Sequence, residues 1–120
     1  MSALESNFEG LVHSLVPLGE LSALSKAQVL TRAEILRYQP GKFVFKQGAR
    51  DPYCFYLLEG QLELICDGET IHRLTGGTPD AVHALAQLQP RKMSARAQSE
   101  VAVLRLNREL LDKLAPADRA

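Results

Sequence analysis

The spacing of apolar residues changes once along the chain, from a helical period to a strand period. Between residues 4 and 16 apolar positions recur every three or four residues, which predicts an amphipathic helix that packs on the rest of the protein. Pro17 and Gly19 then break the chain. Ser25 is suited to cap a second, shorter helix over residues 26–33, because its hydroxyl can accept from a free amide of the first turn.

From Ile35 onward the apolar period is two, and turn residues arrive at short intervals. The expected strands cover residues 35–38, 43–46, 53–58, 61–66, 69–74, 93–98 and 101–106. Residues 53–58 are apolar at nearly every position, which predicts a strand buried on both faces. Asp67-Gly68 predicts a tight hairpin, because these two residues readily adopt the positive φ angles of a two-residue turn.

One segment interrupts the strands. Gly76 and Gly77 end the hairpin, and Thr78 followed by Pro79 predicts the opening of a short helix over residues 81–88. A last helix is expected over residues 108–114, and the tail after it offers no core of its own.

Length and charge narrow the functional classes. A chain of 120 residues fits one domain over residues 1–120, with helices at about 4–33, β-structure at about 35–106 and a helix at about 108–114. Lys plus Arg and Asp plus Glu both number 14, so we expect this chain alone to bind neither nucleic acid nor an anionic membrane. The sequence shows no secretory signal and no apolar run of about 20 residues, so a cytoplasmic location is expected.

The cysteines and histidines predict neither a metal site nor a catalytic site. Cys54 and Cys66 lie in separate apolar runs without a CxxC spacing, which leaves two interpretations: reduced residues in a core, or a disulfide. A metal-dependent cupin-like enzyme would need histidines and a carboxylate that converge on one metal. Of His13, His72 and His83, only His72 falls in an expected strand.

Four short segments carry a family resemblance. Residues 38–41 read Tyr-Gln-Pro-Gly, residues 44–48 Val-Phe-Lys-Gln-Gly, residues 53–60 Tyr-Cys-Phe-Tyr-Leu-Leu-Glu-Gly and residues 61–64 Gln-Leu-Glu-Leu. In this spacing they resemble the successive strands and glycine turns of the cyclic nucleotide-binding domain family, over about residues 8–114. The resemblance implies a mainly β fold with flanking helices, a double-stranded β-helix or jelly-roll-like β-roll.

The resemblance also implies a ligand cassette over residues 77–97. Pro90-Arg91 matches the place of the arginine that forms a charge-assisted fork with the cyclic phosphate. The residues that this match places around a ligand are Gly77, Asp80, Ala81, Val82, His83, Arg91, Lys92 and Ser94.

The chain departs from the family at the ribose contact. The family has Phe-Gly-Glu where this sequence has Asp80-Ala81-Val82, and valine cannot accept the hydrogen bond of the 2′-hydroxyl. Asp80 then has two interpretations. It occupies the anion site, or pairs with Arg91, because a carboxylate is favoured in the first turn of a helix; or it replaces the lost glutamate at the ribose.

Two functions follow from these features. In the first, the domain is a sensor that binds cAMP, cGMP, a cyclic dinucleotide or another nucleotide messenger and signals through its C-terminal helix to an effector. In the second, it is a degenerate, ligand-free domain of the same fold that serves protein–protein contact or dimerisation, and a homodimer through the first and last helices is compatible with both. Neither requires a cofactor or makes the chain an enzyme. The family also includes transcription regulators with a following helix-turn-helix pair, which residues 108–120 do not contain.

Overall fold

The computed structural model describes residues 9–16, 18–85 and 89–119. The elements in chain order, with η marking 3₁₀ helices, are α1 (Glu9–Val12), η2 (Leu18–Glu20), α2 (Ala23–Thr31), β1 (Glu34–Tyr38), β2 (Phe43–Phe45), β3 (Tyr53–Glu59), β4 (Gln61–Cys66), β5 (Glu69–Thr75), η3 (Pro79–Val82), β6 (Ser94–Ala97), β7 (Val101–Asn107) and α3 (Arg108–Arg119).

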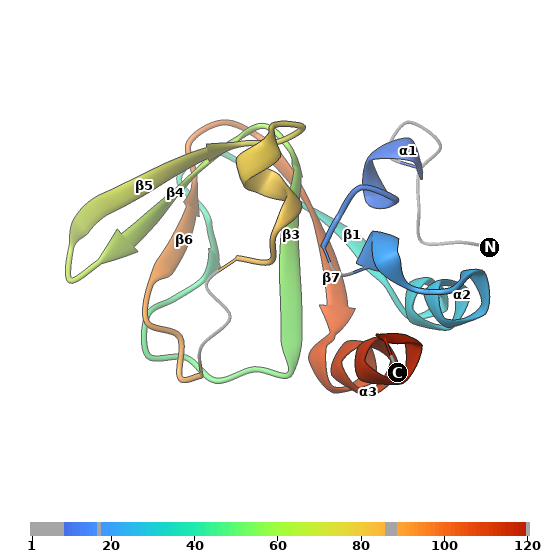
Figure 1. Cartoon of the computed structure of the whole chain (residues 1–120). Helices are drawn as coiled ribbons and strands as arrows, with labels where there is room; N and C mark the ends of the chain where they lie inside the picture. The colour runs from blue at the N-terminus through green and yellow to red at the C-terminus, as the bar shows by residue number, and fades with distance from the viewer. Residues whose placement is uncertain (1–8, 17, 86–88, 120) are drawn as a thin grey trace.

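Two antiparallel sheets form a β-roll, as the family resemblance implies. One sheet has the strand order β1-β7-β3 and the other the order β2-β6-β4-β5 (Figure 1). The β4–β5 hairpin projects from the body, with β5 at the edge of its sheet. Asp67 and Gly68 take φ angles of 52° and 83° at its tip, which confirms the predicted two-residue turn.

Strand β3 is buried on both faces, and this divides the core in two. Cys54, Tyr56 and Leu58 face the helices, while Phe55 and Leu57 face the interior of the roll. Each fully buried aliphatic side chain contributes about 1.5–3 kcal/mol relative to exposure. The uninterrupted apolar run at residues 53–58 therefore has a direct physical reason, because this strand separates two apolar layers.

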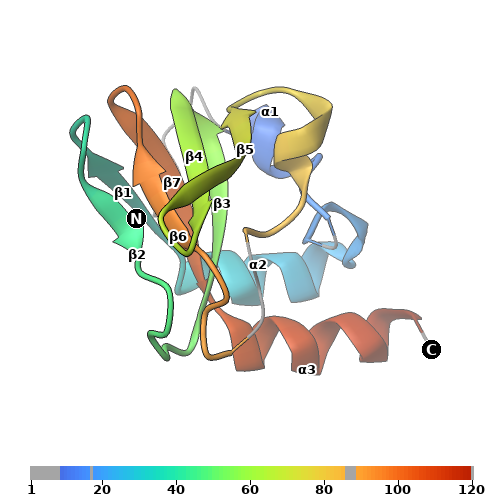
Figure 2. The same cartoon turned by 90° about the vertical axis from the view of Figure 1, so that its left-hand side faces the viewer.

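The helices cover one side of the roll. Side chains from α1, α2 and α3, among them Val12, Val29 and Leu111, pack on the β1-β7-β3 sheet. Helices α2 and α3 contact each other beneath the strands (Figure 2). No helix among the described residues is both long enough and apolar enough to cross a membrane.

The first two helices differ from the sequence predictions. The described part of the first helix ends at Val12, because the chain turns there to bring Val16 into a bridge with His83; residues 1–8 lie outside the described residues. Helix α2 begins before Ser25: the Ser22 hydroxyl is the cap and accepts from the Ser25 amide. Both serines are of the residue type that is favoured at a helix cap.

The last helix is longer than predicted. Helix α3 runs from Arg108 to Arg119 and includes Pro116, although the sequence pattern ends the helix at Leu114. Proline lacks the amide hydrogen and therefore removes one backbone hydrogen bond, and here the helix continues past that loss.

Candidate functional site

The cassette begins at a turn that only glycine fits. The Gly76 amide donates to the Gly60 carbonyl at 2.9 Å, and a β-carbon at Gly76 would lie 2.5 Å from the Glu59 nitrogen. Gly77, a predicted site residue, follows with φ of 83° and is exposed. This close approach anchors the start of the cassette against the end of β3.

The predicted helix over residues 81–88 is wrong. The structure has a single 3₁₀ turn, η3, after which His83 is extended (φ −98°, ψ 152°). Tertiary hydrogen bonds hold the chain open, since the Val16 amide donates to the Val82 carbonyl and the Leu85 amide donates to the Phe55 carbonyl, both at 2.8 Å. Residues 86–88 of the predicted helix lie outside the described residues.

The turn η3 begins at the residue that the sequence predicts, but the predicted cap hydrogen bond is not made. Thr78 is the cap residue and Pro79 comes first in the turn, as predicted. The Thr78 hydroxyl, however, donates to the Thr75 carbonyl at 2.6 Å instead of capping η3. Among the described residues of the cassette there is therefore no full helix whose N-terminus could receive an anion.

Arg91 is buried and held by a carboxylate. Only 1% of the residue is exposed. Its Nε and Nη2 donate to the two carboxylate oxygens of Asp51 at 3.0 and 2.7 Å, which makes a bidentate ion pair. Nη2 also donates to the Tyr53 carbonyl at 2.7 Å, and Nη1 to the Leu85 carbonyl at 3.4 Å. The expectation that Asp80 pairs with Arg91 is therefore wrong, because Asp51 from the loop before β3 takes that place.

The surroundings fix Arg91 from three further directions. Its guanidinium carbon lies 4.2 Å from the ring centre of Phe45 and 5.4 Å from that of Phe55, within the range of cation–π attraction. Its backbone is tied to the β2–β3 loop, since the Arg91 amide donates to the Ala49 carbonyl and the Gly48 amide donates to the Arg91 carbonyl. The guanidinium is therefore held inside the roll by contacts with several elements.

Asp51 is held as firmly as its partner. The Tyr53 amide donates to its carboxylate at 3.0 Å, and its own amide donates to the Gln89 side chain at 3.1 Å. Partial burial raises the pKa of Asp51, but the hydrogen bonds from Arg91 and Tyr53 and the charges of Arg91 and Arg108 outweigh it and hold the pKa below its ordinary value. Asp51 is therefore ionised and paired at neutral pH.

Arg108 brings the last helix into the same network. As the first residue of α3, it donates from Nη2 to the Tyr53 carbonyl at 2.6 Å and from Nη1 to the Asp51 carbonyl at 3.5 Å. Its Nε is buried and has no hydrogen-bond partner among the described residues. One carbonyl, that of Tyr53, thus accepts from the cassette arginine and from the start of α3.

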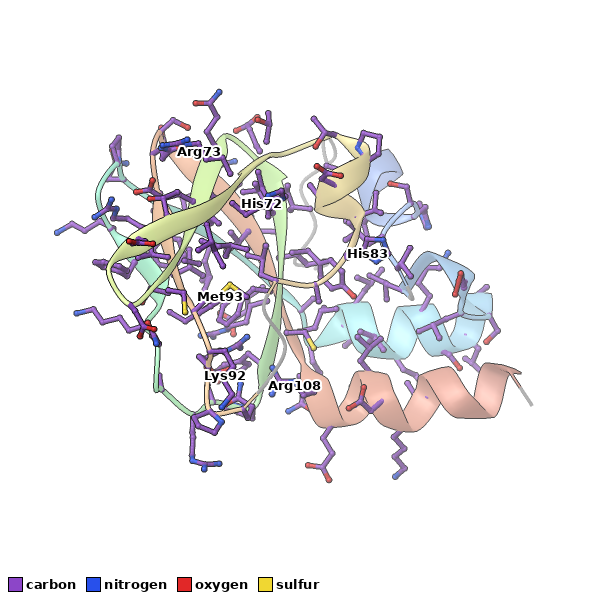
Figure 3. The ribbon with its side chains drawn as sticks, turned by 60° about the vertical axis from the view of Figure 1, so that its left-hand side comes forward. His72, Arg73, His83, Lys92, Met93 and Arg108 are labelled. Atoms are coloured by element: carbon purple, nitrogen blue, oxygen red, sulfur yellow. The ribbon has the colours of Figure 1, made fainter. Side chains whose placement is uncertain are left out.

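A cavity of about 290 Å³ lies between the β4–β5 hairpin and η3. Its lining residues are Leu64, His72, Leu74, Pro79, Asp80, His83, Ala84 and Leu85. Figure 3 shows His72 on β5 and His83 after η3, whereas Lys92 lies with Arg108 at the end of the roll next to α3. Asp80 and His83 are the two predicted site residues at this cavity.

The other predicted site residues have separate places. Ala81 packs in the roll core, and the Val82 carbonyl is used by Val16. Lys92 is exposed, and the Ser94 hydroxyl accepts from the Gln47 amide at 2.8 Å. The structure thus divides the predicted ligand set between the cavity, the core and the outside.

Sequence reasoning missed Asp51, His72 and Arg108. Asp51 directly precedes Pro52, and this local sequence is typical of a turn. Its role depends on the loop passing beside Arg91, 40 residues away in sequence. His72 could have been found, since strand alternation places it with the inward-facing Leu74.

A family model and a curated relative agree on the family that this chain resembles. The model of the cyclic nucleotide-binding domain matches residues 35–118. The chain is 29% identical over 111 residues to the cAMP-dependent protein kinase regulatory subunit of Emericella nidulans, a match that covers 89% of this chain and 26% of that protein. The chain thus spans about a quarter of the length of that curated relative.

Solved structures share the fold. The sensor domain of the transcriptional regulator DNR from Pseudomonas aeruginosa has a TM-score of 0.76 at 15% identity, over 91% of this chain and 80% of that one. The regulatory subunit of a cAMP-independent protein kinase A from Trypanosoma cruzi, bound to guanosine, has a TM-score of 0.75 at 13% identity, over 93% and 42%. At these identities the likeness shows the β-roll fold.

Proposed function

Because the chain belongs to the cyclic nucleotide-binding domain family, we propose that it is a non-catalytic regulatory module whose phosphate site is filled from within by Asp51. The bidentate pair between Asp51 and Arg91 carries this proposal. The Asp51 carboxylate supplies two anionic oxygens to the arginine fork, which is the role that the resemblance gives to the cyclic phosphate.

A cyclic phosphate would have to displace this carboxylate. The phosphate would itself compensate Arg91, so its net gain would be only the difference between its bonds to the guanidinium and those that Asp51 already makes. Phosphate on Arg91 would also leave the Asp51 carboxylate beside a second anion, which is repulsive. The Tyr53 and Leu85 carbonyls hold the same guanidinium in place, so it is not free to turn toward a ligand.

The ribose contact also argues against a cyclic nucleotide. Val82 stands where the family has its glutamate, and a ribose hydroxyl buried there without an acceptor would cost about 1–3 kcal/mol. These two losses act on neighbouring parts of the same ligand, because the 2′-hydroxyl lies on the carbon next to the one that carries the 3′-oxygen of the cyclic phosphate. The two losses together favour a degenerate domain that binds no cyclic nucleotide and acts through contact with a protein partner.

Helix α3 is the element that we assign to this output. Arg108 at its start shares the Tyr53 carbonyl with Arg91, so a change at the cassette alters the seating of the helix. The relative from Emericella nidulans is a regulatory subunit of a kinase, which supports action on a protein partner.

A cyclic-nucleotide sensor is the second candidate, and one observation favours it. Leu85, whose carbonyl accepts from Arg91, also lines the cavity. Arg91 thus contacts a residue of the cavity lining, although Arg91 is not itself part of the lining. In this version the ligand phosphate would compete with Asp51 for the guanidinium.

Isothermal titration of the purified chain with cAMP, cGMP and a cyclic dinucleotide distinguishes the ligand-free module from the cyclic-nucleotide sensor. The proposal predicts no binding tighter than about 100 μM, equivalent to about −5.5 kcal/mol. A Kd below about 10 μM for the wild type that is lost in Arg91→Ala would establish the sensor instead. Lys113→Ala, which removes an exposed positive charge outside the predicted ligand set, is the control.

A further inference from the structure

Two hollows adjoin where helices α2 and α3 lie side by side (Figure 2). Their volumes are about 310 and 270 Å³, and both are lined by Arg32 and Leu110. Gln28 and Thr31 of α2 complete the first hollow, and Lys113 of α3 is among the residues that complete the second. Because two lining residues are shared, the hollows form one continuous groove between the helices, the α2–α3 groove.

The face of α2 that lines this groove carries an exposed apolar side chain. Leu24 is 72% exposed, more than any other large apolar side chain among the described residues. Residues 24, 28 and 31 are four and three positions apart, so the helix places them on one face. Leu110, which is half-buried against the core, is the apolar contact in the hollows. Residues 24 and 31 are about 10 Å apart along the helix axis, so a partner needs two apolar side chains about two helical turns apart.

The charge of the groove favours an acidic partner. Arg32 and Lys113 are exposed, and neither side chain forms an ion pair or a hydrogen bond with a described residue. Glu109 is the one carboxylate among the described lining residues. Two cations against one carboxylate leave the groove positive, although the chain as a whole carries no net charge. Carboxylates on a partner complement this charge.

The groove also borders the network around Arg91. The side-chain oxygen of Asn107, which lines the second hollow, accepts from the Leu110 amide at 2.8 Å and so caps α3. Arg108, the next residue, donates to the Tyr53 carbonyl that also accepts from Arg91. A partner seated on Leu110 therefore contacts the turn of α3 that is tied to the cassette through this shared carbonyl.

We propose that the α2–α3 groove binds an acidic amphipathic helix of a partner protein. Two apolar side chains of that helix pack on Leu24 and Leu110, and acidic side chains beside them pair with Arg32 and Lys113. Recognition of a helix in a groove combines apolar anchors, which supply affinity, with charges that select the partner. This inference rests on the proposed function, because it names the kind of protein that the regulatory module contacts.

Panning a displayed library of random peptides of about 12 residues, or three helical turns, on the full chain tests the proposal. Enriched peptides are expected to carry Asp or Glu together with two apolar residues about two helical turns apart. A synthetic copy of an enriched peptide is expected to bind the wild type with a Kd below about 100 μM and to shift the amide signals of α2 and α3.

Variants of exposed residues locate the binding. Arg32→Glu reverses the charge that borders both hollows and is expected to raise the Kd roughly tenfold. Leu24→Ala removes an apolar anchor and is expected to raise the Kd roughly threefold or more. Lys42→Glu makes the same charge reversal at an exposed residue between β1 and β2 and is the matched control, with no expected effect. Thermal unfolding of each variant checks that it folds as the wild type does.

The outcomes separate this inference from the proposed function. If no peptide is enriched, if the enriched peptides lack acidic residues, or if Arg32→Glu binds them as the wild type does, the inference is overturned and the proposed function stands. The inference is also overturned if Arg32→Glu dissociates a wild-type dimer or abolishes binding to phosphatidylserine vesicles, because a second copy or a membrane then fills the groove. Tight binding of cAMP that is lost in Arg91→Ala overturns the ligand-free module of the proposed function and leaves the peptide result unchanged.

Discussion

The ion pair between Asp51 and Arg91 combines a side chain that is completely buried with one that is 20% exposed. Such pairs are costly to break from one side, because the remaining charge stays in a low-dielectric environment. Replacing both partners with uncharged residues removes that penalty. The pair is therefore expected to show strong coupling in stability measurements.

Asp51→Asn is predicted to lower the free energy of unfolding by about 3 kcal/mol, because it leaves the Arg91 charge uncompensated. The double variant Asp51→Asn with Arg91→Met is predicted to recover at least about 1 kcal/mol of this loss, because the Tyr53 carbonyl keeps its bond from Arg108. Urea unfolding of the two single variants and the double variant measures the coupling. Strictly additive losses would contradict a direct pair.

At the scale of elements, the β4–β5 hairpin depends on its turn. Gly68 has φ of 83°, which a β-carbon makes unfavourable, although a β-carbon there would contact nothing within 4 Å. Gly68→Ala is predicted to destabilise the protein by about 1 kcal/mol. Gly10→Ala in α1 is the matched control, since it has equal space and no positive φ, and is predicted to be neutral or slightly stabilising. Equal thermal shifts for both variants would show that backbone strain is not the cause.

The link between the cassette and α3 makes a second prediction at this scale. Arg108→Ala removes the bond to the Tyr53 carbonyl and is predicted to cost about 2 kcal/mol. Amide exchange should accelerate first in α3, while the β-roll keeps its protection. Lys113→Ala, an exposed position on the same helix, is expected to change stability by less than about 0.5 kcal/mol. Uniform acceleration across both sheets would contradict a local anchor.

The elements differed in how well the sequence predicted them. The strands and the Asp67-Gly68 hairpin follow from local pattern, because side-chain alternation and turn geometry are properties of neighbouring residues. The segment after Pro79 does not, because its backbone bonds go to Val16 and Phe55, which are distant in sequence. Asp51 could not be predicted for the same reason, because its contact with Arg91 joins residues that are distant in sequence and forms only in the folded roll.

At the scale of the whole molecule, two carboxylates make stability depend on acid pH. The hydrogen bond from Arg96 is the main cause that lowers the pKa of Glu63. At Asp51, burial raises the pKa, but the hydrogen bonds and the charge of Arg91 outweigh this effect, so the net pKa is lowered. Both folded pKa values therefore lie below the ordinary values of 4.5 and 3.8, so the stabilisation is present above those values and is lost as the pH falls through the folded ones.

Urea unfolding between about pH 7 and pH 2 is therefore predicted to show falling stability below about pH 4. Asp51→Asn should show a shallower decline, because one of the two carboxylates no longer titrates. Glu69→Gln, an exposed carboxylate in the hairpin, should follow the wild-type curve. Parallel curves for wild type and Asp51→Asn would mean that the ion pair does not contribute.

We propose that the carboxylate of Asp51, and not a ligand, is bound to the guanidinium of Arg91 in the cassette. The most direct measurement is the side-chain Nε–H signal of Arg91 in a nitrogen–proton NMR spectrum, assigned by its loss in Arg91→Ala. The ion pair with Asp51 predicts a slowly exchanging signal without ligand that changes in Asp51→Asn and stays in place when about 1 mM cAMP is added. A signal that shifts with cAMP in the wild type, while the carboxyl carbon of Asp51 moves toward its solvent-exposed value, would contradict it.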